Sequence, residues 1–384
     1  MTDKIQIGVL GATGMAGREA IQKIINLEYA ELALVTGSPS SAGEKYGKIF
    51  KEKEEALSRS YEFWEPQKCP ERYRELEVRE TDPEVIVEEA DYVISALPSS
   101  VAEDVEPEIR ENGVSVFSNS STYRWKQNVP LLIPEINHKH IEHVENQEQS
   151  GKQANNPNCT TAGYVPVIGI LEDQGLGIKS VDLVTMQSIS GKGDKISNED
   201  YSGWISGNVI DDWSPEERFN GEEQKSEIEP QKILGRHTDR ESVVAEFTDF
   251  RENGPSEDLD ILPISAETRR VPTQYGHLES VKITFEEEIS VEDFEEALES
   301  WSITGKVGRL PTTPENLVEV REQVEPVNDV FAGEGMTLVV GDARKLGPKE
   351  IGFVSLSHNL RRGATWTAIQ SMELYLQEIE DYSF

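Results

Sequence analysis

The chain has 384 residues, which is more than one ordinary domain holds and favours two domains. Hydrophobic residues make up 36% of it, so it can bury real cores and is not a disordered protein. Its 72 acidic residues against 37 basic ones give a net charge of -35, spread along the whole length. This charge excludes nucleic acid and anionic membranes as partners. It is typical of a protein from a halophile, in which salt screens the repulsion.

Cysteine usage and the chain start indicate the compartment. Two cysteines, Cys69 and Cys159, are too few for a disulfide framework. The first residues enter a strand pattern without the charged and apolar parts of a signal peptide. No apolar run approaches the ~20 residues of a membrane span. We therefore expect a cytoplasmic protein with no membrane partner, and we predict no metal site.

The first elements predict a dinucleotide-binding fold. An apolar strand pattern, Ile5–Leu10, runs into a turn with glycines three residues apart, at Gly11, Gly14 and Gly17. A helix with one apolar face follows, and then a second strand at residues 32–35. The order strand, glycine turn, helix, strand is typical of a Rossmann-type doubly wound sheet in an α/β protein.

The remaining elements indicate a second domain of a different kind. Residues 43–80 are polar and are predicted to carry a helix or two, and a helix is also expected at residues 161–172. Further strands are expected at residues 92–97, 114–117, 131–136, 180–190, 243–248, 279–287 and 338–341. The later strands predict an α+β domain with a mostly antiparallel sheet and a helix at 292–300. The last segment, 363–380, reads as an amphipathic helix that returns to pack on the first domain.

The glycine turn predicts which cofactor binds. Its backbone can approach a pyrophosphate at the N-terminus of the following helix. No acidic residue ends the second strand; the hydroxyls of Ser38 and Ser41 and the ammonium of Lys45 stand there instead, which favours NADP over NAD. Cofactor contacts are therefore expected at Gly11, Thr13, Gly14, Met15, Gly17, Ser38 and Ser41. The competing interpretation is a tight turn without a ligand.

Cys159 stands just before the predicted helix at 161–172, where the helix dipole favours a thiolate. A thiolate there can attack an aldehyde, and the adduct can pass a hydride to a nicotinamide and leave a thioester. Taken alone, a buried structural cysteine is the commoner case, and Cys69 is interpreted in that way.

Several segments together resemble the archaeal and fungal branch of the aspartate-semialdehyde dehydrogenases. They are residues 11–17, 156–161, 185–191, 221–225, 229–235, 270–277 and 358–359. Each segment alone is a weak signal, but their order and spacing match along nearly the whole chain. The loop at residues 192–195 departs from the small Gly/Pro-containing loop that is usual in this family.

The resemblance implies an organisation and an activity. The NADP-binding domain would comprise residues 1–158 and 360–384, and a catalytic and dimerisation domain of the glyceraldehyde-3-phosphate-dehydrogenase-like kind would comprise 159–359. The implied reaction is NADPH-dependent reductive dephosphorylation of L-4-aspartyl phosphate to L-aspartate 4-semialdehyde, in lysine, threonine, methionine and isoleucine biosynthesis. The implied partners are the small-molecule substrate, inorganic phosphate and further copies of the chain, as a homodimer or homotetramer.

The resemblance also implies catalytic roles for individual residues. Cys159 is expected to be the nucleophile, and His277 the general acid and base for the thiol proton and the oxyanion. Gln187 is expected to orient the intermediate. Arg270 is expected to clamp the substrate α-carboxylate, since a guanidinium pairs with a carboxylate through two hydrogen bonds.

Other residues are expected to bind the charged groups of the substrates. Glu222 would accept the substrate ammonium, with Lys225 in the same site, and Arg124 and Asn158 would bind phosphate. Further cofactor contacts are expected at Ser190, Gly191 and, beside the nicotinamide amide, Asn359. Without the resemblance, each of these residues also fits a structural role, such as a helix pair for Glu222 and Lys225.

Three alternatives remain open at this point. N-acetylglutamyl-phosphate reductases share the glycine turn, but they tend to carry Gly-Cys-Tyr where this chain has Asn158-Cys159-Thr160. A malonyl-CoA reductase built on the same branch would need a CoA pocket and no phosphate. A non-catalytic dinucleotide-binding protein would keep the glycine turn but would have no need of the cysteine, glutamine, arginine and histidine.

Overall fold

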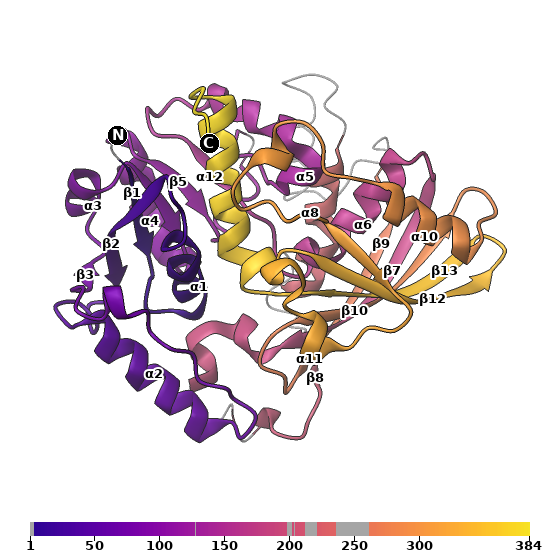
Figure 1. Cartoon of the computed structure of the whole chain (residues 1–384), viewed down its shortest axis with the longest axis horizontal. Helices are drawn as coiled ribbons and strands as arrows, with labels where there is room; N and C mark the ends of the chain where they lie inside the picture. The colour runs from indigo at the N-terminus through magenta and orange to yellow at the C-terminus, as the bar shows by residue number, and fades with distance from the viewer. Residues whose placement is uncertain (1–3, 127, 198–201, 203, 212–220, 236–260) are drawn as a thin grey trace.

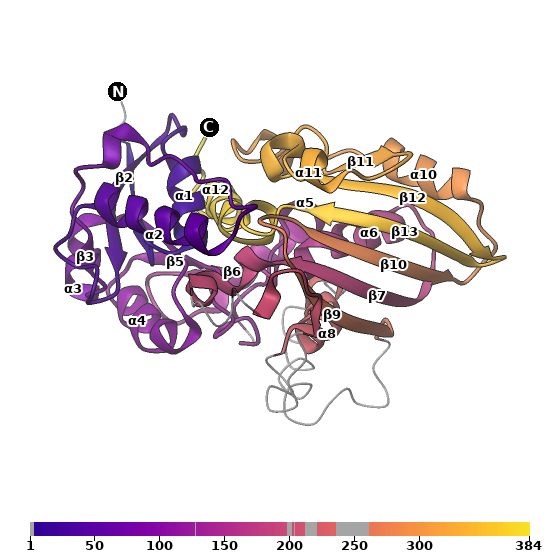
Figure 2. The ribbon, with the colours of Figure 1, turned by 90° about the horizontal axis from the view of Figure 1, so that it is seen from below.

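Two β-sheets organise the chain in the computed structural model, which describes residues 4–126, 128–197, 202, 204–211, 221–235 and 261–384. The N-terminal sheet and the C-terminal sheet lie at opposite ends of the molecule, and the last helix, α12 (Trp366–Glu378), runs between them (Figure 1). Figure 2 shows this helix end-on in the same position.

The N-terminal sheet is entirely parallel. Its strands are β1 (Ile5–Leu10), β2 (Ala30–Gly37), β3 (Arg79–Glu80), β4 (Tyr92–Ser95), β5 (Ser115–Ser118) and β6 (Gln153–Asn155). Their order is β3-β2-β1-β4-β5-β6. The order reverses between β1 and β4, which is where a doubly wound sheet opens a crevice at the carboxyl ends of its strands. The predicted fold is therefore confirmed.

Helices cover both faces of this sheet. On one face, α1 (Met15–Ile24) and α12 form an apolar core with the strands, and on the other face α3 (Pro83–Glu89) and α4 (Ser99–Glu111) form a second core. The polar excursion at residues 43–80 contains α2 (Tyr46–Ser60), as predicted.

The strand predicted at residues 131–136 is wrong. Only Leu131 makes a strand contact, an isolated parallel bridge to Asn155 in β6. Pro134 has no N–H to donate to a ladder, and its fixed φ suits the first turn of a helix, so α5 (Pro134–Asn137) begins there.

The C-terminal sheet has seven strands among the described residues. They are β7 (Ile178–Ser188), β8 (Ile210–Asp211), β9 (Ile264–Val271), β10 (His277–Phe285), β11 (Val318–Arg321), β12 (Leu338–Gly347) and β13 (Glu350–Ser357), in the order β11-β12-β13-β10-β7-β9-β8. The β7–β9 and β11–β12 pairs are parallel, and the others are antiparallel. A mixed, mostly antiparallel sheet was expected; the strand predicted at 243–248 lies outside the described residues.

One face of this sheet packs against α6 (Thr161–Asp173), α8 (Glu222–Leu234) and α10 (Val291–Ser300). The other face is open along β7, where side chains alternate between buried and exposed and Val184 is 39% exposed. The shorter helical elements are η1 (Glu71–Tyr73), η2 (His138–Asn146), η3 (Ile189–Ser197), η5 (Val307–Arg309), α11 (Pro326–Asp329), η6 (Ala332–Gly335) and the π-helical η7 (Arg361–Thr365). None of the helices in the described part of the chain has the length and apolar character that crossing a bilayer requires.

The final helix corrects a second expectation. It does return to the N-terminal sheet, but it is not amphipathic in its surroundings, because every side chain from Trp366 to Leu376 is buried. Its polar residues bond internally: Gln370 donates from Nε2 to Glu135, and Glu373 accepts from the N–H and hydroxyl of Thr312. A helix enclosed by two parts of a protein has no solvent face to show.

Candidate active site

Strand ends from both sheets bring the predicted catalytic residues together. Cys159 follows the carboxyl end of β6 and comes two residues before α6 begins. His277 is the first residue of β10, and it stands directly opposite Gln187 of the neighbouring antiparallel strand β7. Cys159 and His277, which are 118 residues apart in the chain, therefore meet between the two sheets.

Cys159 and His277 are in direct contact. The Sγ of Cys159 lies 3.0 Å from Nε2 of His277. The backbone N–H of Ser188 donates to Nδ1 at 3.2 Å, which orients the ring toward the sulfur. Burial, together with the guanidinium of Arg270, lowers the pKa of His277 to about 3, although a backbone hydrogen bond at Gly276 opposes this shift. The imidazole is therefore neutral at physiological pH.

The environment of Cys159 opposes ionisation of the thiol. Burial, together with the nearby charge of Glu222, raises the pKa of the Cys159 thiol to about 12, while Arg270 and Arg124 act in the opposite direction. The expectation that the helix N-terminus would favour a thiolate is therefore outweighed by desolvation. Ionisation has to be coupled to proton transfer or to a change of nearby charge.

Glycine at residue 363 lets the η7 segment pack directly against Cys159. A Cβ at Gly363 would lie 2.7 Å from the Cβ of Cys159. The segment is fixed because the guanidinium of Arg362, fully buried, donates to both oxygens of Glu135 at 2.9 and 3.0 Å and to the carbonyl of Met336. Neither Gly363 nor Arg362 was predicted to belong to the site, although both follow closely on segment 358–359, which carries part of the family resemblance.

Gln187 contacts the residue that follows Cys159. Its Nε2 donates to the hydroxyl of Thr160, the residue after Cys159, at 2.8 Å. Its Oε1 is buried without a hydrogen-bond partner among the described residues. This amide is therefore held by the neighbour of Cys159, and its carbonyl oxygen can still accept a hydrogen bond.

Glu222 and Lys225 form a charged pair at the start of α8, next to the nucleophile loop. Glu222 accepts from Asn158 Nδ2 at 2.7 Å and from Lys225 Nζ at 3.1 Å. Burial alone would raise the pKa of Glu222, but the cations of Lys225 and Arg270 hold it well below its usual range. Glu222 therefore stays ionised in the site.

Arg270 lies in β9 and faces the same space. It is 3% exposed, and its Nη1 donates to the carbonyl of Ser188 at 2.7 Å. A Cβ at Gly191 would lie 2.8 Å from that Nη1 and 3.3 Å from His277 Cε1. Gly191 thus lies directly against the arginine and the histidine, and any larger residue would collide with them.

The expected phosphate pair is tied to a residue of segment 229–235 to which no role was assigned from sequence. Arg124 donates from Nη1 to Glu229 and from Nη2 to the carbonyl of Asn119. The N–H of Asn158 donates to the same Glu229 carboxylate. Glu229 stands seven residues after Glu222 on α8, a spacing that places both on one helix face and is the signal that was available.

Asn359 connects the site elements to each other. Its Oδ1 accepts from the N–H of Gly276, next to His277, and its Nδ2 donates to the hydroxyl of Ser190. Ser190 also contacts the hydroxyl of Ser188 at 3.2 Å. The predicted cofactor residues Ser190 and Asn359 therefore lie near His277, but their polar groups are already hydrogen-bonded within the protein.

The glycine turn has the geometry of a dinucleotide site. Gly11 has φ +69°, and a Cβ there would lie 2.7 Å from the carbonyl of Ala96 at the end of β4. A Cβ at Gly17 would lie 2.7 Å from the Cα of Ala12, whereas one at Gly14 would meet nothing closer than 3.4 Å. The first and third glycines are thus required by the turn itself, and the second leaves the N-terminus of α1 open to a ligand.

The other predicted cofactor residues surround this turn. The hydroxyl of Ser38 contacts those of Ser40 and Ser41 at 2.9 and 3.3 Å. Lys45, by contrast, donates to the carbonyl of Glu75. The remaining two, Thr13 and Met15, are both buried, the latter in an apolar cluster with residues of α2 and η3.

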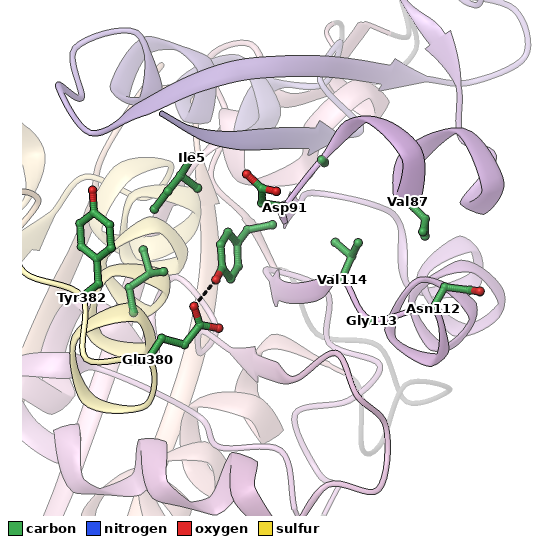
Figure 3. Close-up of a pocket in the computed structure, with 11 residues that line it drawn as sticks. Ile5, Val87, Asp91, Asn112, Gly113, Val114, Glu380 and Tyr382 are labelled. Carbon is green, nitrogen blue, oxygen red and sulfur yellow. Dashed lines mark hydrogen bonds between the residues drawn. The ribbon is translucent and has the colours of Figure 1, made fainter. Parts of the chain in front are cut away.

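A cavity of about 440 Å³ lies on the opposite edge of the N-terminal sheet (Figure 3). It is lined by the amino ends of β1 and β4, by Val114 and by the chain end at Glu380 and Tyr382. None of the predicted site residues lines it. Ligands of doubly wound sheets bind at the carboxyl ends of the strands, so this cavity belongs to a different place from the site.

Two comparisons cover nearly the whole chain. Residues 6–144 match the family model "Semialdehyde dehydrogenase, NAD binding domain", and residues 168–362 match "Semialdehyde dehydrogenase, dimerisation domain". An aspartate-semialdehyde dehydrogenase of Archaeoglobus fulgidus is 36% identical over 98% of this chain and 99% of its own length. A malonyl CoA reductase (NADP) of Metallosphaera sedula is 28% identical over 98% of each chain.

A solved structure agrees with this fold. The aspartate-semialdehyde dehydrogenase of Candida albicans with NADP superimposes with a TM-score of 0.77 at 28% identity, over 97% of this chain and 98% of that one. The fold and the matches define an oxidoreductase of the semialdehyde dehydrogenase class with an NAD(P)-binding domain. Within this class, the chain belongs to the aspartate-semialdehyde dehydrogenase family.

Proposed function

We propose that the chain catalyses the reversible, NADPH-dependent reductive dephosphorylation of L-4-aspartyl phosphate to L-aspartate 4-semialdehyde. The observation that carries this proposal is the 3.0 Å contact between Cys159 and His277 beside two opposite charges, Arg270 and Glu222. A small zwitterionic substrate needs one cation for its carboxylate and one anion for its ammonium. The reaction would serve the synthesis of lysine, threonine, methionine and isoleucine.

The residues divide the chemistry among themselves. The sulfur of Cys159 forms a bond to the acyl carbon, the bond from that carbon to the phosphate oxygen breaks, and a thioester remains. His277 would take the thiol proton at Nε2 in the tautomer that carries hydrogen on Nδ1, which requires release of the Ser188 N–H contact, and would pass it to the departing phosphate. When bound, NADPH would supply the hydride for reduction of the thioester. Gln187, held by Thr160, would orient the reacting carbonyl. Collapse of the thiohemiacetal oxyanion then breaks the C–S bond, releases the semialdehyde and leaves the Cys159 thiolate, which regains a proton through His277.

The charges of the substrate bear on the pKa of the thiol. The charge of Glu222 is one cause of the raised pKa of Cys159, while Arg270 and Arg124 lower it. A substrate ammonium beside Glu222 would offset the first effect, and the substrate carboxylate and phosphate would offset the second. Lys225 also pairs with Glu222. Arg124 and Asn158 are the residues that we propose to bind phosphate.

The cofactor in this proposal is NADP. The turn at Gly11, Gly14 and Gly17 would hold the pyrophosphate at the N-terminus of α1. The hydroxyls of Ser38 and Ser41, which follow β2 without an acidic residue, would receive the 2′-phosphate. Ser190, Gly191 and Asn359 would lie at the nicotinamide end.

The remaining parts of the proposal concern the whole molecule. Residues 1–158 and 360–384 would form the NADP-binding domain, and residues 159–359 the catalytic and dimerisation domain. The matched dimerisation model supports a homodimer or homotetramer. The net charge of -35 supports a halophilic, cytoplasmic enzyme that works in concentrated salt.

One coupled assay tests the proposed function. The oxidative reaction should form NADPH from aspartate semialdehyde only when phosphate is present, and C159A should abolish turnover while NADP still binds. Malonate semialdehyde with CoA is the first control substrate, because the malonyl CoA reductase is 28% identical to this chain. N-acetylglutamate semialdehyde is the second. Faster turnover of either control substrate, or retained activity of C159A, would refute the proposal.

A further inference from the structure

Glu229 is a buried carboxylate, and both of its oxygens accept hydrogen bonds from residues of the candidate site. It is 0% exposed in the middle of α8. Its Oε1 accepts from Nη1 of Arg124 at 2.8 Å, and its Oε2 accepts from the backbone N–H of Asn158 at 2.5 Å. Asn158 immediately precedes Cys159, so one carboxylate joins the arginine to the nucleophile loop.

The two donors that Glu229 occupies would otherwise form an anion site. A guanidinium and a backbone N–H aimed at one point are the usual donors to phosphate oxygens. Here the chain itself supplies the anion, because Glu229 accepts from both. The positive charge of Arg124 is therefore paired internally before any ligand arrives.

A second residue of α8 prevents Arg124 from moving away. Lys232 is buried, and its ammonium donates to three carbonyl oxygens, those of Arg124, Lys126 and Val129, at 2.7, 3.0 and 2.7 Å. Burial lowers the pKa of Lys232 to about 7, against the opposing charge of Glu229. The same helix thus fixes both the backbone and the guanidinium of Arg124.

One N–H of the Arg124 guanidinium group has no hydrogen-bond partner among the described residues. It is that of the buried Nε, since Nη2 donates to the carbonyl of Asn119. An incoming anion therefore meets an arginine that retains a donor but whose charge a carboxylate already balances.

We propose that Glu229 is a positioning residue that keeps the affinity of this site for phosphate low. The inference rests on the proposed function, in which Arg124 and Asn158 contact phosphate. In the reductive direction, phosphate must leave the acylated enzyme, and an internally paired arginine releases it more readily than an unpaired one. In the oxidative direction, the same pairing makes the enzyme depend on a high phosphate concentration.

The test replaces the carboxylate with an amide of the same shape in E229Q. Binding of inorganic phosphate is titrated by calorimetry at constant ionic strength, with no semialdehyde present. The Kd for phosphate should fall on the order of 10-fold, because charge-assisted pairing with the carboxylate is lost. The KM for phosphate should fall by a similar factor, with the KM for semialdehyde unchanged. An unchanged or weaker affinity for phosphate would overturn the inference.

Glu227 provides the matched control, because it lies on the same helix and accepts a backbone N–H, that of Ala266, but no guanidinium. E227Q should leave the Kd for phosphate unchanged. If E229Q does not fold, R124Q is compared with R124Q/E229Q, which loses both charges together. The double variant should bind phosphate more tightly than R124Q, and equal or weaker binding would overturn the inference. Because these titrations need no turnover, they separate this inference from the proposed reaction.

Discussion

Adding one methyl group next to Cys159 tests how strongly the proposed reaction depends on the position of its sulfur. In G363A the new Cβ would lie 2.7 Å from the Cβ of Cys159 and 3.0 Å from its Cα. Ordinary carbon–carbon contact begins at roughly 3.5 Å, so the overlap demands a displacement of about 1 Å. The backbone at residue 363 is held in place because Arg362 is hydrogen-bonded to Glu135, so we expect Cys159 to move instead.

The displacement falls on the reacting atom. The 3.0 Å contact between Cys159 and His277 lengthens, and a misplacement of about 1 Å costs on the order of 100-fold in rate. We therefore expect kcat to fall about 100-fold, with the Kd for NADP unchanged. Stopped-flow turnover and a fluorescence titration with NADP measure the two quantities separately.

A matched glycine on α6 provides the control. In G169A the new Cβ would also lie 2.7 Å from a neighbour, but that neighbour is a side-chain methyl of Ile136 and lies away from Cys159. Residue 169 lies ten residues along from Cys159, about 15 Å at the rise of an α-helix. G169A should lower stability and leave kcat within about twofold. A folded G363A with a parent-like kcat, or an equal loss in G169A, would show that the reasoning is wrong.

Three further predictions concern buried charge. Glu279 is fully buried in β10, and burial raises its pKa well above the usual value. Its folded pKa thus exceeds the unfolded one, so its stabilisation is present below about pH 4 and is lost as pH rises toward the folded pKa, at about 1.4 kcal/mol per unit. E279Q should therefore resist urea better than the parent at pH 8 and equally near pH 4; no gain at pH 8 would contradict this. R362M strands Glu135 without its guanidinium and should lose about 3–5 kcal/mol of unfolding free energy in urea, and a loss below about 1 kcal/mol would mean that the pair is unimportant. E222Q should lower the pKa of the Cys159 thiol, so that iodoacetamide reacts faster at pH 8, whereas an unchanged pH profile would exclude Glu222 as a cause of the raised pKa.

Local patterns were sufficient to predict the first strand, glycine turn, helix and second strand. The strand Ile5–Leu10 and the glycine turn depend on alternation and on backbone sterics within a few residues, which are visible in sequence. The predicted strand at 131–136 failed because its apolar residues serve a short helix behind Pro134. The last helix was misjudged because its environment is set by two distant parts of the chain.

The candidate site divides in the same way. The structure brings Cys159, His277 and Gln187 together as the resemblance implied. Glu229 and Gly363 were given no role, since their importance lies in what they touch at long sequence separation; for Glu229 the seven-residue spacing from Glu222 was the available signal. The pKa of a thiol likewise depends on desolvation by the surrounding fold, which no motif encodes.

The position of α12 has a consequence for how the protein comes into being. The N-terminal sheet emerges from the ribosome long before α12, the helix that completes its core, because α12 begins only at Trp366. During translation the nascent sheet must therefore wait with apolar surface uncovered, and chaperones have their longest opportunity to bind it there. A stop codon shortly before Trp366 would leave both halves of the protein unfinished.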